Sequence, residues 1–87
     1  MKYLHYPLVG KKGNKVKVKF DAPCKVLLMN GTVYSHYEKG ISFTAYGGYK
    51  ETSPVVFKLK KDGNWHVVIE LNGYFNPDRI NASVEIN

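Results

Sequence analysis

Apolar and polar residues alternate with a period of two along several short stretches of this chain. Between residues 15 and 20, Val16, Val18 and Phe20 alternate with three lysines. The apolar side chains of such a segment fall on one face of an extended strand, and the ammonium groups fall on the other. The same alternation recurs in four further stretches, residues 41–45, 55–60, 65–71 and 80–86. No window of eleven residues has the period of a helix, so the pattern predicts an all-β protein.

Glycine, proline and Asn-Gly pairs separate these stretches, as turn residues separate strands. Residues 2–8 form a first predicted strand. Residues 24–29 are apolar on both faces in their second half, which indicates a central strand. Strands this short and this closely spaced are typical of a sandwich or barrel. We therefore predict that residues 1–87 form a single domain, a compact antiparallel β-sandwich (jelly-roll-like) of about seven to eight short strands.

Between the strands, the sequence predicts four connections. Residues 31–39 are polar and aromatic, and we expect a loop with at most one helical turn, closed by Gly40. Residues 46–49 end the fourth strand, residues 61–64 make a hairpin turn, and residues 72–77 form the last long loop. If successive strands are antiparallel, residues 46–49 and the last loop lie at the same end of the sandwich.

Three residues have individual interpretations. Trp65 lies on the inward face of its strand with Val67 and Ile69, and we expect it in the core. Cys24 begins a strand and is interpreted as a small buried hydrophobe, since free cysteine is among the most buried residue types. His66 alternates away from Trp65, so we expect it on a solvent-facing surface of the sheet.

Composition places limits on partners and location. The chain has a formal net charge of +6, but its basic residues are twelve lysines and only Arg79. Recognition of phosphates and bases usually relies on the planar fork of arginine, so the lysines are interpreted first as solvation of strand faces. The beginning of the sequence lacks the apolar region of a secretory signal, and no apolar run is long enough to span a bilayer. We expect a cytoplasmic protein with no membrane span.

Catalytic and metal-binding patterns are absent from the sequence. Cys24 is the one cysteine, so neither an intramolecular disulfide nor a cysteine-based zinc site is available. The three histidines do not stand in a nucleophile–base arrangement, and the seven acidic residues are spread without metal-ligand spacing. We therefore predict no enzymatic activity, no metal and no cofactor.

The leading hypothesis is a recognition module that uses the aromatic loops at one end of the sandwich. Tyrosine gives rigid, amphipathic contact area, and paired glycines permit close approach of another molecule. The expected partner is a protein, self-association included, and a small molecule such as a nucleotide or sugar is the second choice. The simpler alternative is that these aromatic residues only cap the core. The predicted binding residues are Tyr46, Gly47, Gly48, Tyr49, Tyr74 and Phe75.

An alternative function is polyanion binding, to nucleic acid or another anionic surface. If the strands that carry the lysines are neighbours, their ammonium groups form one basic patch. The opposing interpretation is a solvated face that blocks aggregation between sheet edges. Nucleic acid is less expected than a protein partner. The residues of this alternative site are Lys15, Lys17, Lys19, Lys58 and Lys60.

A set of short motifs distributed over nearly the whole chain carries a resemblance to a known family. The motifs are Met1-Lys2-Tyr3-Leu4-His5-Tyr6, Leu28-Met29, Tyr34 with Tyr37, Gly47-Gly48, Ser53-Pro54, Gly63-Asn64-Trp65 and Leu71-Asn72-Gly73-Tyr74. In this order they resemble a bacterial domain-of-unknown-function family of small β-sandwich proteins, also found as the N-terminal domain of some TIR-domain proteins. The resemblance implies a β-sandwich and, by analogy, a sensing or protein-contact role in bacterial defence or signalling.

Overall fold

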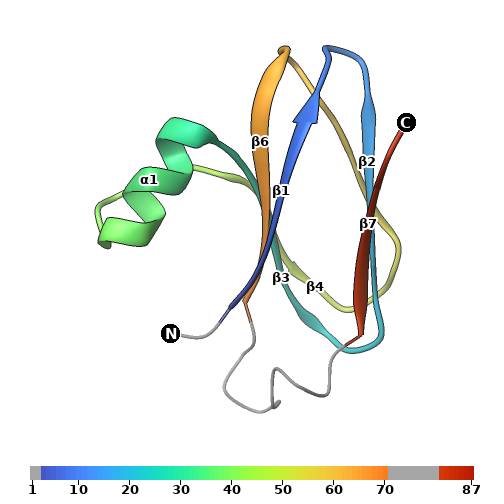
Figure 1. The fold of residues 1–87 in the computed structure, drawn as a ribbon. Helices are drawn as coiled ribbons and strands as arrows, with labels where there is room; N and C mark the ends of the chain where they lie inside the picture. The colour runs from blue at the N-terminus through green and yellow to red at the C-terminus, as the bar shows by residue number, and fades with distance from the viewer. Residues whose placement is uncertain (1–2, 71–80) are drawn as a thin grey trace.

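Two antiparallel sheets face each other in the computed structural model, which describes residues 3–70 and 81–87 (Figure 1). One sheet has four strands in the order β1-β6-β3-β4, and the other has three in the order β5-β2-β7. The predicted β-sandwich is confirmed, with seven strands in the described residues. The elements are β1 (Tyr3–Gly10), β2 (Lys15–Phe20), β3 (Cys24–Asn30), α1 (Gly31–Lys39), β4 (Tyr46–Lys50), β5 (Val55–Lys58), β6 (Gly63–Glu70) and β7 (Ala82–Ile86).

Most connections cross from one sheet to the other, as they do in jelly rolls. One such crossing corrects the predicted hairpin at residues 61–64, because β5 pairs with β2 whereas β6 pairs with β1 and β3. Asp62 and Gly63 favour a turn, but local turn chemistry does not determine which sheet the next strand joins. Leu59 lies at this crossing and is buried, with its backbone N–H donating to the Asn14 carbonyl at 2.8 Å.

The main core lies between the two sheets. Its buried members include Val16 and Val18 of β2 and Val26 and Leu28 of β3. Trp65 is 6% exposed and donates its indole N–H to the Lys61 carbonyl at 3.1 Å, so its predicted core position is confirmed. The core also contains Cys24, as predicted, and burial raises the pKa of its thiol.

A second, smaller core lies on the opposite face of the four-stranded sheet, beneath α1. Figure 1 shows α1 on the side of this sheet that faces away from β2 and β7. Leu27 and Met29 of β3 and Val68 of β6 are buried there, packed against Val33 and other side chains of α1 and its surroundings. Strands β3 and β6 are therefore buried on both faces, which explains why residues 27–29 lack alternation.

Helix α1 corrects the prediction of a loop over residues 31–39. The Asn30 side chain accepts a hydrogen bond from the Val33 N–H at 2.8 Å and caps the N-terminus. At the other end, Gly40 has φ +71°, and the Gly40 and Ile41 N–H groups donate to the Tyr37 and His36 carbonyls in a Schellman arrangement. The helix has only nine residues, and no helix in the described ranges is long and apolar enough to cross a membrane.

Strand β4 corrects the predicted loop at residues 46–49. Residues 41–45 alternate in hydrophobicity but form no strand, whereas residues 46–50 pair with β3. Gly47 makes this pairing possible, since it has φ +107° and a Cβ there would collide with the Val26 carbonyl oxygen. The absence of a Cβ at Gly47 therefore permits the close approach of a neighbouring strand backbone of the same chain.

Candidate ligand-binding site

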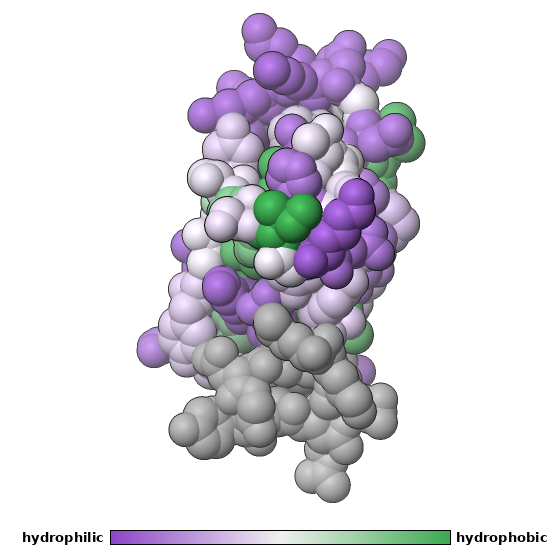
Figure 2. All heavy atoms as spheres, turned by 90° about the vertical axis from the view of Figure 1, so that its left-hand side faces the viewer, coloured by the Kyte–Doolittle hydropathy of each residue, from purple (hydrophilic) through white to green (hydrophobic). Residues whose placement is uncertain are grey.

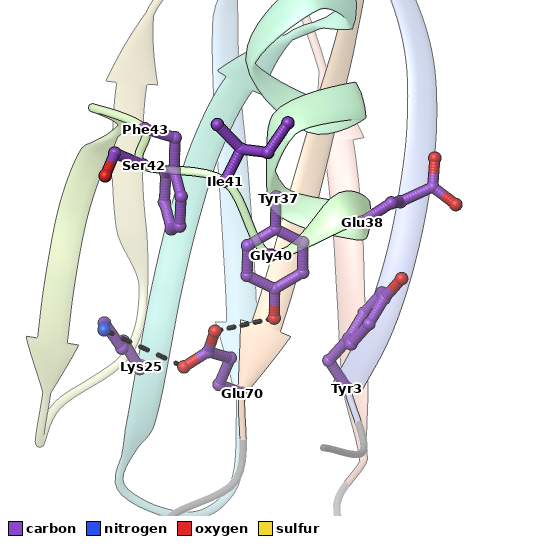
Figure 3. Close-up of a pocket in the computed structure, with 9 residues that line it drawn as sticks. All are labelled: Tyr3, Lys25, Tyr37, Glu38, Gly40, Ile41, Ser42, Phe43 and Glu70. Carbon is purple, nitrogen blue, oxygen red and sulfur yellow. Dashed lines mark hydrogen bonds and ion pairs between the residues drawn. The ribbon is translucent and has the colours of Figure 1, made fainter.

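A pocket of about 610 Å³ opens between the C-terminal end of α1 and the outer face of the four-stranded sheet. Figure 3 shows that its lining comes from elements far apart in the sequence. We call it the α1 pocket and define it by Tyr3 of β1, Lys25 of β3, Tyr37 and Glu38 of α1, Glu70 of β6, and Phe43 of the segment between α1 and β4. Residues 40–42 also line it.

Aromatic rings form the apolar walls of the α1 pocket. The Tyr3 and Tyr37 ring centroids are 5.0 Å apart with an interplanar angle of 77°, and those of Tyr37 and Phe43 are 5.3 Å apart at 83°. Tyr37 therefore stands nearly perpendicular to both neighbours. Such edge-to-face contacts stabilise the arrangement and fix the ring orientations before any ligand enters.

Glu70 supplies the main polar group of the α1 pocket. Tyr37 donates its hydroxyl proton to Glu70 Oε2 at 2.6 Å, and Lys25 Nζ lies 3.8 Å from Glu70 Oε1. The Glu70 side chain is only 12% exposed. Burial and this hydrogen bond raise the pKa of the Tyr37 hydroxyl, which therefore remains a donor at all physiological pH values. The pocket thus contains a carboxylate held in a defined orientation.

Next to the α1 pocket, Tyr34 of α1 covers two histidines of the sheet. Its ring stacks on His5 at 4.1 Å between centroids and on His66 at 4.5 Å. His5 Nε2 lies 2.7 Å from His66 Nδ1, so one imidazole donates and the other accepts. The prediction that His66 faces solvent is wrong, because α1 covers this face of the sheet. Burial lowers the pKa of both histidines, and the charge of His5 lowers that of His66 further.

Four residues of the predicted aromatic site, 46–49, lie in the described part of the chain. Tyr46 and Tyr49 are about half exposed, at 48% and 52%, but they belong to β4 rather than to a loop. Tyr46 lies opposite Leu28, with Lys60 Nζ 5.4 Å from its ring centroid, whereas Tyr49 lies opposite Lys25 beside the α1 pocket. Gly47 and Gly48 separate the two. The remaining predicted residues, Tyr74 and Phe75, lie outside the described residues.

The lysine-bearing strands are neighbours, as the alternative site requires. Lys15 of β2 lies opposite Lys58 of β5. Further along β2, the lysines lie next to an acidic residue. Lys17 lies opposite Glu85 of β7, and Lys19 Nζ is 3.8 Å from Glu85 Oε1. A separate cavity of about 590 Å³ is lined by Lys12, Gly13, Lys58, Leu59 and Lys60. The basic surface is therefore concentrated near Lys58 and not spread along β2.

The comparisons with known proteins identify the family. Residues 1–86 match the family model described as Domain of unknown function (DUF1883). The chain belongs to the DUF1883 family. Searches of curated proteins and of solved structures returned no match. The α1 pocket of this DUF1883 domain is therefore interpreted from its own geometry.

Sequence reasoning missed every residue that defines the α1 pocket of this DUF1883 domain. One usable signal was present: Val33, Tyr34 and Tyr37 have the spacing of one helical face, and they lie between the cap residues Asn30 and Gly40. Glu70 gave a weaker signal as a single acid at the end of an apolar strand. Within residues 3–70 and 81–87, no group of three or more His, Cys, Asp or Glu side chains is placed to hold a metal ion.

Proposed function

We propose that this DUF1883 domain is a non-enzymatic binding module and that the α1 pocket is its ligand site. The observation that carries the proposal is the oriented, largely buried Glu70 carboxylate beneath the rings of Tyr3, Tyr37 and Phe43. Apolar walls with a few oriented polar groups are typical of ligand pockets, and a volume of about 610 Å³ lies inside their usual range of roughly 300–1,000 Å³.

The surroundings of the α1 pocket favour a partner protein that presents the bound group. Three large apolar side chains near it are exposed, Ile41 at 51%, Phe43 at 39% and Tyr49 at 52%. Figure 2, which views the α1 side, shows apolar atoms in small separate spots on a mostly hydrophilic surface. A broad flat contact needs a larger continuous apolar area. A partner that inserts one side chain into the α1 pocket fits this surface better.

The resemblance to TIR-associated domains suggests a setting for this activity. We propose that the domain acts in the bacterial cytoplasm as a sensing or protein-contact unit in defence or signalling, by analogy with the family setting. Binding at the α1 pocket is the physical step that such a unit needs, and self-association is one form of protein contact that it allows.

Chemical-shift mapping on the ¹⁵N-labelled chain tests the location of the site. The probes are nucleotides, sugars, alkylamines and short peptides, together with a dilution series for self-association. We expect saturable shifts at the amides of Tyr3, Tyr37 and Glu70, and their loss in Glu70→Gln. The matched control is Glu85→Gln, which removes the same charge from an ion pair of the same 3.8 Å length on the other sheet. Shifts confined to residues outside the α1 pocket would show that the proposed site is wrong.

A second candidate function is anion binding at the lysine-lined cavity. The observation that favours it is the convergence of Lys12, Lys58 and Lys60 on one concavity, with Lys15 opposite Lys58. We expect a short oligonucleotide to bind weakly and to lose most of its affinity between 50 and 200 mM salt, because binding releases counterions. The double variant Lys58→Gln/Lys60→Gln would abolish this binding, whereas Lys19→Gln, whose ammonium is paired with Glu85, would change it little. Binding that is insensitive to salt would contradict this candidate.

A further inference from the structure

We propose that the group bound in the α1 pocket is a small organic cation, such as a quaternary or alkylated ammonium group. This inference rests on the proposed binding function and adds the chemical class of the ligand. It is supported by the orientation of the aromatic rings, by the balance of charge in the pocket and by the state of the Glu70 carboxylate.

The aromatic rings provide π faces for a cation. The face of an aromatic ring carries negative electrostatic potential and attracts ammonium groups within about 6 Å of its centroid. Because Tyr37 is nearly perpendicular to Tyr3 and to Phe43, the rings form corners instead of a parallel stack. Figure 3 shows the Tyr37 ring between those of Phe43 and Tyr3, with its hydroxyl directed at the Glu70 carboxylate. A cation in such a corner contacts more than one ring.

The charge of the α1 pocket is opposite to that of the whole chain. Two carboxylates, Glu38 and Glu70, and one ammonium, Lys25, line the pocket, which gives a formal charge of −1 in a protein of net charge +6. Charges beyond about 8 Å are largely screened at physiological salt, so the local charge decides which ligands are attracted. An anionic ligand would face both carboxylates.

Hydrogen bonding at Glu70 also favours a cationic ligand over an anionic one. The Tyr37 hydroxyl proton is already donated to Glu70, so Tyr37 has no second proton to offer an anion or a carbonyl group. An ionised carboxylate accepts about four hydrogen bonds, and in the structure Glu70 has one donor at 2.6 Å and the Lys25 ammonium at 3.8 Å. It therefore retains the capacity to stabilise an additional positive group.

Lys25 occupies the position that a ligand cation would compete for. Its ammonium is beyond normal hydrogen-bond length from Glu70, and its side chain is 44% exposed. The pair is exposed only at its Lys25 end and is too long for a hydrogen bond, so an incoming cation can displace the Lys25 ammonium while Glu70 stays in place. Removal of the Lys25 charge should therefore strengthen cation binding. It would weaken the binding of an anion.

The test compares choline with 3,3-dimethylbutan-1-ol, a neutral molecule of the same shape in which carbon replaces the charged nitrogen. Each is titrated into the full ¹⁵N-labelled chain at constant ionic strength. We expect choline to bind with a millimolar Kd and to shift the amides of Tyr3, Tyr37 and Phe43. We expect the neutral analogue to bind about five to ten times more weakly, the difference that a cation–π contact and one carboxylate provide.

Four variants then separate ligand class from site location. Choline affinity should fall about fivefold or more in Glu70→Gln and rise about two- to threefold in Lys25→Gln. Glu85→Gln and Lys19→Gln alter the matched ion pair on the other sheet and should leave the Kd unchanged. The amide spectrum of each variant shows whether it is folded.

The outcomes distinguish the two proposals. Equal binding of choline and its neutral analogue in the α1 pocket would overturn the cation inference and leave the binding site in place. Weaker choline binding in Lys25→Gln would also overturn it. If choline gives no shifts while another probe saturates the α1 pocket, the ligand class is wrong. If no probe shifts these residues, the site itself is wrong, and the cation inference is overturned with it.

Discussion

The two faces of the four-stranded sheet differ sharply in chemistry. The inner face packs against the other sheet through Val26, Leu28, Trp65, Val67 and Ile69, and within the described residues it buries apolar side chains alone. Among residues 3–70 and 81–87, the outer face has three buried apolar residues, and beside them lie tyrosines, two histidines and Glu70. Both layers use the same two strands, β3 and β6.

This difference separates stability from recognition. An apolar core of interlocking side chains stabilises the fold, but it leaves no polar group to contact a ligand. The layer under α1 is covered by a helix of only nine residues, which leaves the α1 pocket open at the C-terminal end of the helix. The thinner layer therefore retains oriented polar groups that a ligand can contact.

Trp65→Ala should have the largest effect, because Trp65 is the largest buried side chain of the inner core among the described residues. We expect a loss of about 3–5 kcal/mol in the free energy of unfolding, from lost burial and from the cavity that remains. Urea denaturation followed by circular dichroism measures this loss. A variant with an unchanged denaturation midpoint would contradict the distinction between the two layers, since it would mean that the inner core does not dominate stability.

Leu28→Ala and Leu27→Ala make the comparison on adjacent residues of β3. Leu28 is 1% exposed in the inner core, and Leu27 is 4% exposed beneath α1. We expect about 3–5 kcal/mol for Leu28→Ala and about 2–3 kcal/mol for Leu27→Ala, because a short helix can settle into the space more easily than a second sheet can. Under conditions where both variants are folded, only Leu27→Ala should weaken choline binding. Equal effects on stability and on binding would contradict this assignment.

Acidification should produce the smallest change, and it should act on the outer layer. His5 and His66 have pKa values in the folded chain below the unfolded value of about 6.5. At a pH between the folded and the unfolded pKa, the unfolded chain therefore binds more protons than the folded chain. Their contribution to stability is therefore complete above pH 6.5 and is lost as pH falls through the lowered values. Protonation of both rings also removes the hydrogen bond between them. Glu38 opposes the effect, since its charge raises both pKa values.

The measurement compares urea midpoints at pH 7.5 and pH 5.5 for the wild type and for His66→Phe. The variant retains a ring for stacking on Tyr34, and its urea midpoint should decrease less than that of the wild type between pH 7.5 and pH 5.5. His36→Gln, which removes a histidine of α1 outside the stacked set, is the control and should behave like the wild type. If the urea midpoint of His66→Phe falls as much between pH 7.5 and pH 5.5 as that of the wild type, the imidazole pair is not the source of the pH dependence.

Most strand positions were predictable, with β4 the exception, because burial of one face between two sheets produces a period of two in the sequence. The alternation around Val16 and Val18, and the inward position of Trp65, correspond to residues that are almost fully buried. The absence of alternation near Leu27 correctly indicated a central strand. It did not reveal what covers the second face, because a strand buried on both sides looks the same whether a helix or another sheet lies above it.

The α1 pocket was not predictable, because its residues come together only through the packing of α1. Tyr3 lies 34 positions before Tyr37, and Tyr37 lies 33 positions before Glu70, and no motif of known ligand-binding chemistry connects them. Tyr46 and Tyr49 of the predicted site lie in strand β4 and not in a loop, because Gly47 supports a strand pairing instead of a turn. Glycine permits both conformations, so the sequence alone does not distinguish them.

The sequence by itself determined that this chain buries one side of each strand in a common core, because a period of two requires a pleated strand with one apolar face. Tertiary structure decided the pairing of strands, the docking of α1 and the proximity of Glu70 to three aromatic rings. These features depend on contacts between residues distant in the chain. The stability of each such contact depends on which two surfaces pack together, and local patterns of hydrophobicity do not specify the pairing of surfaces.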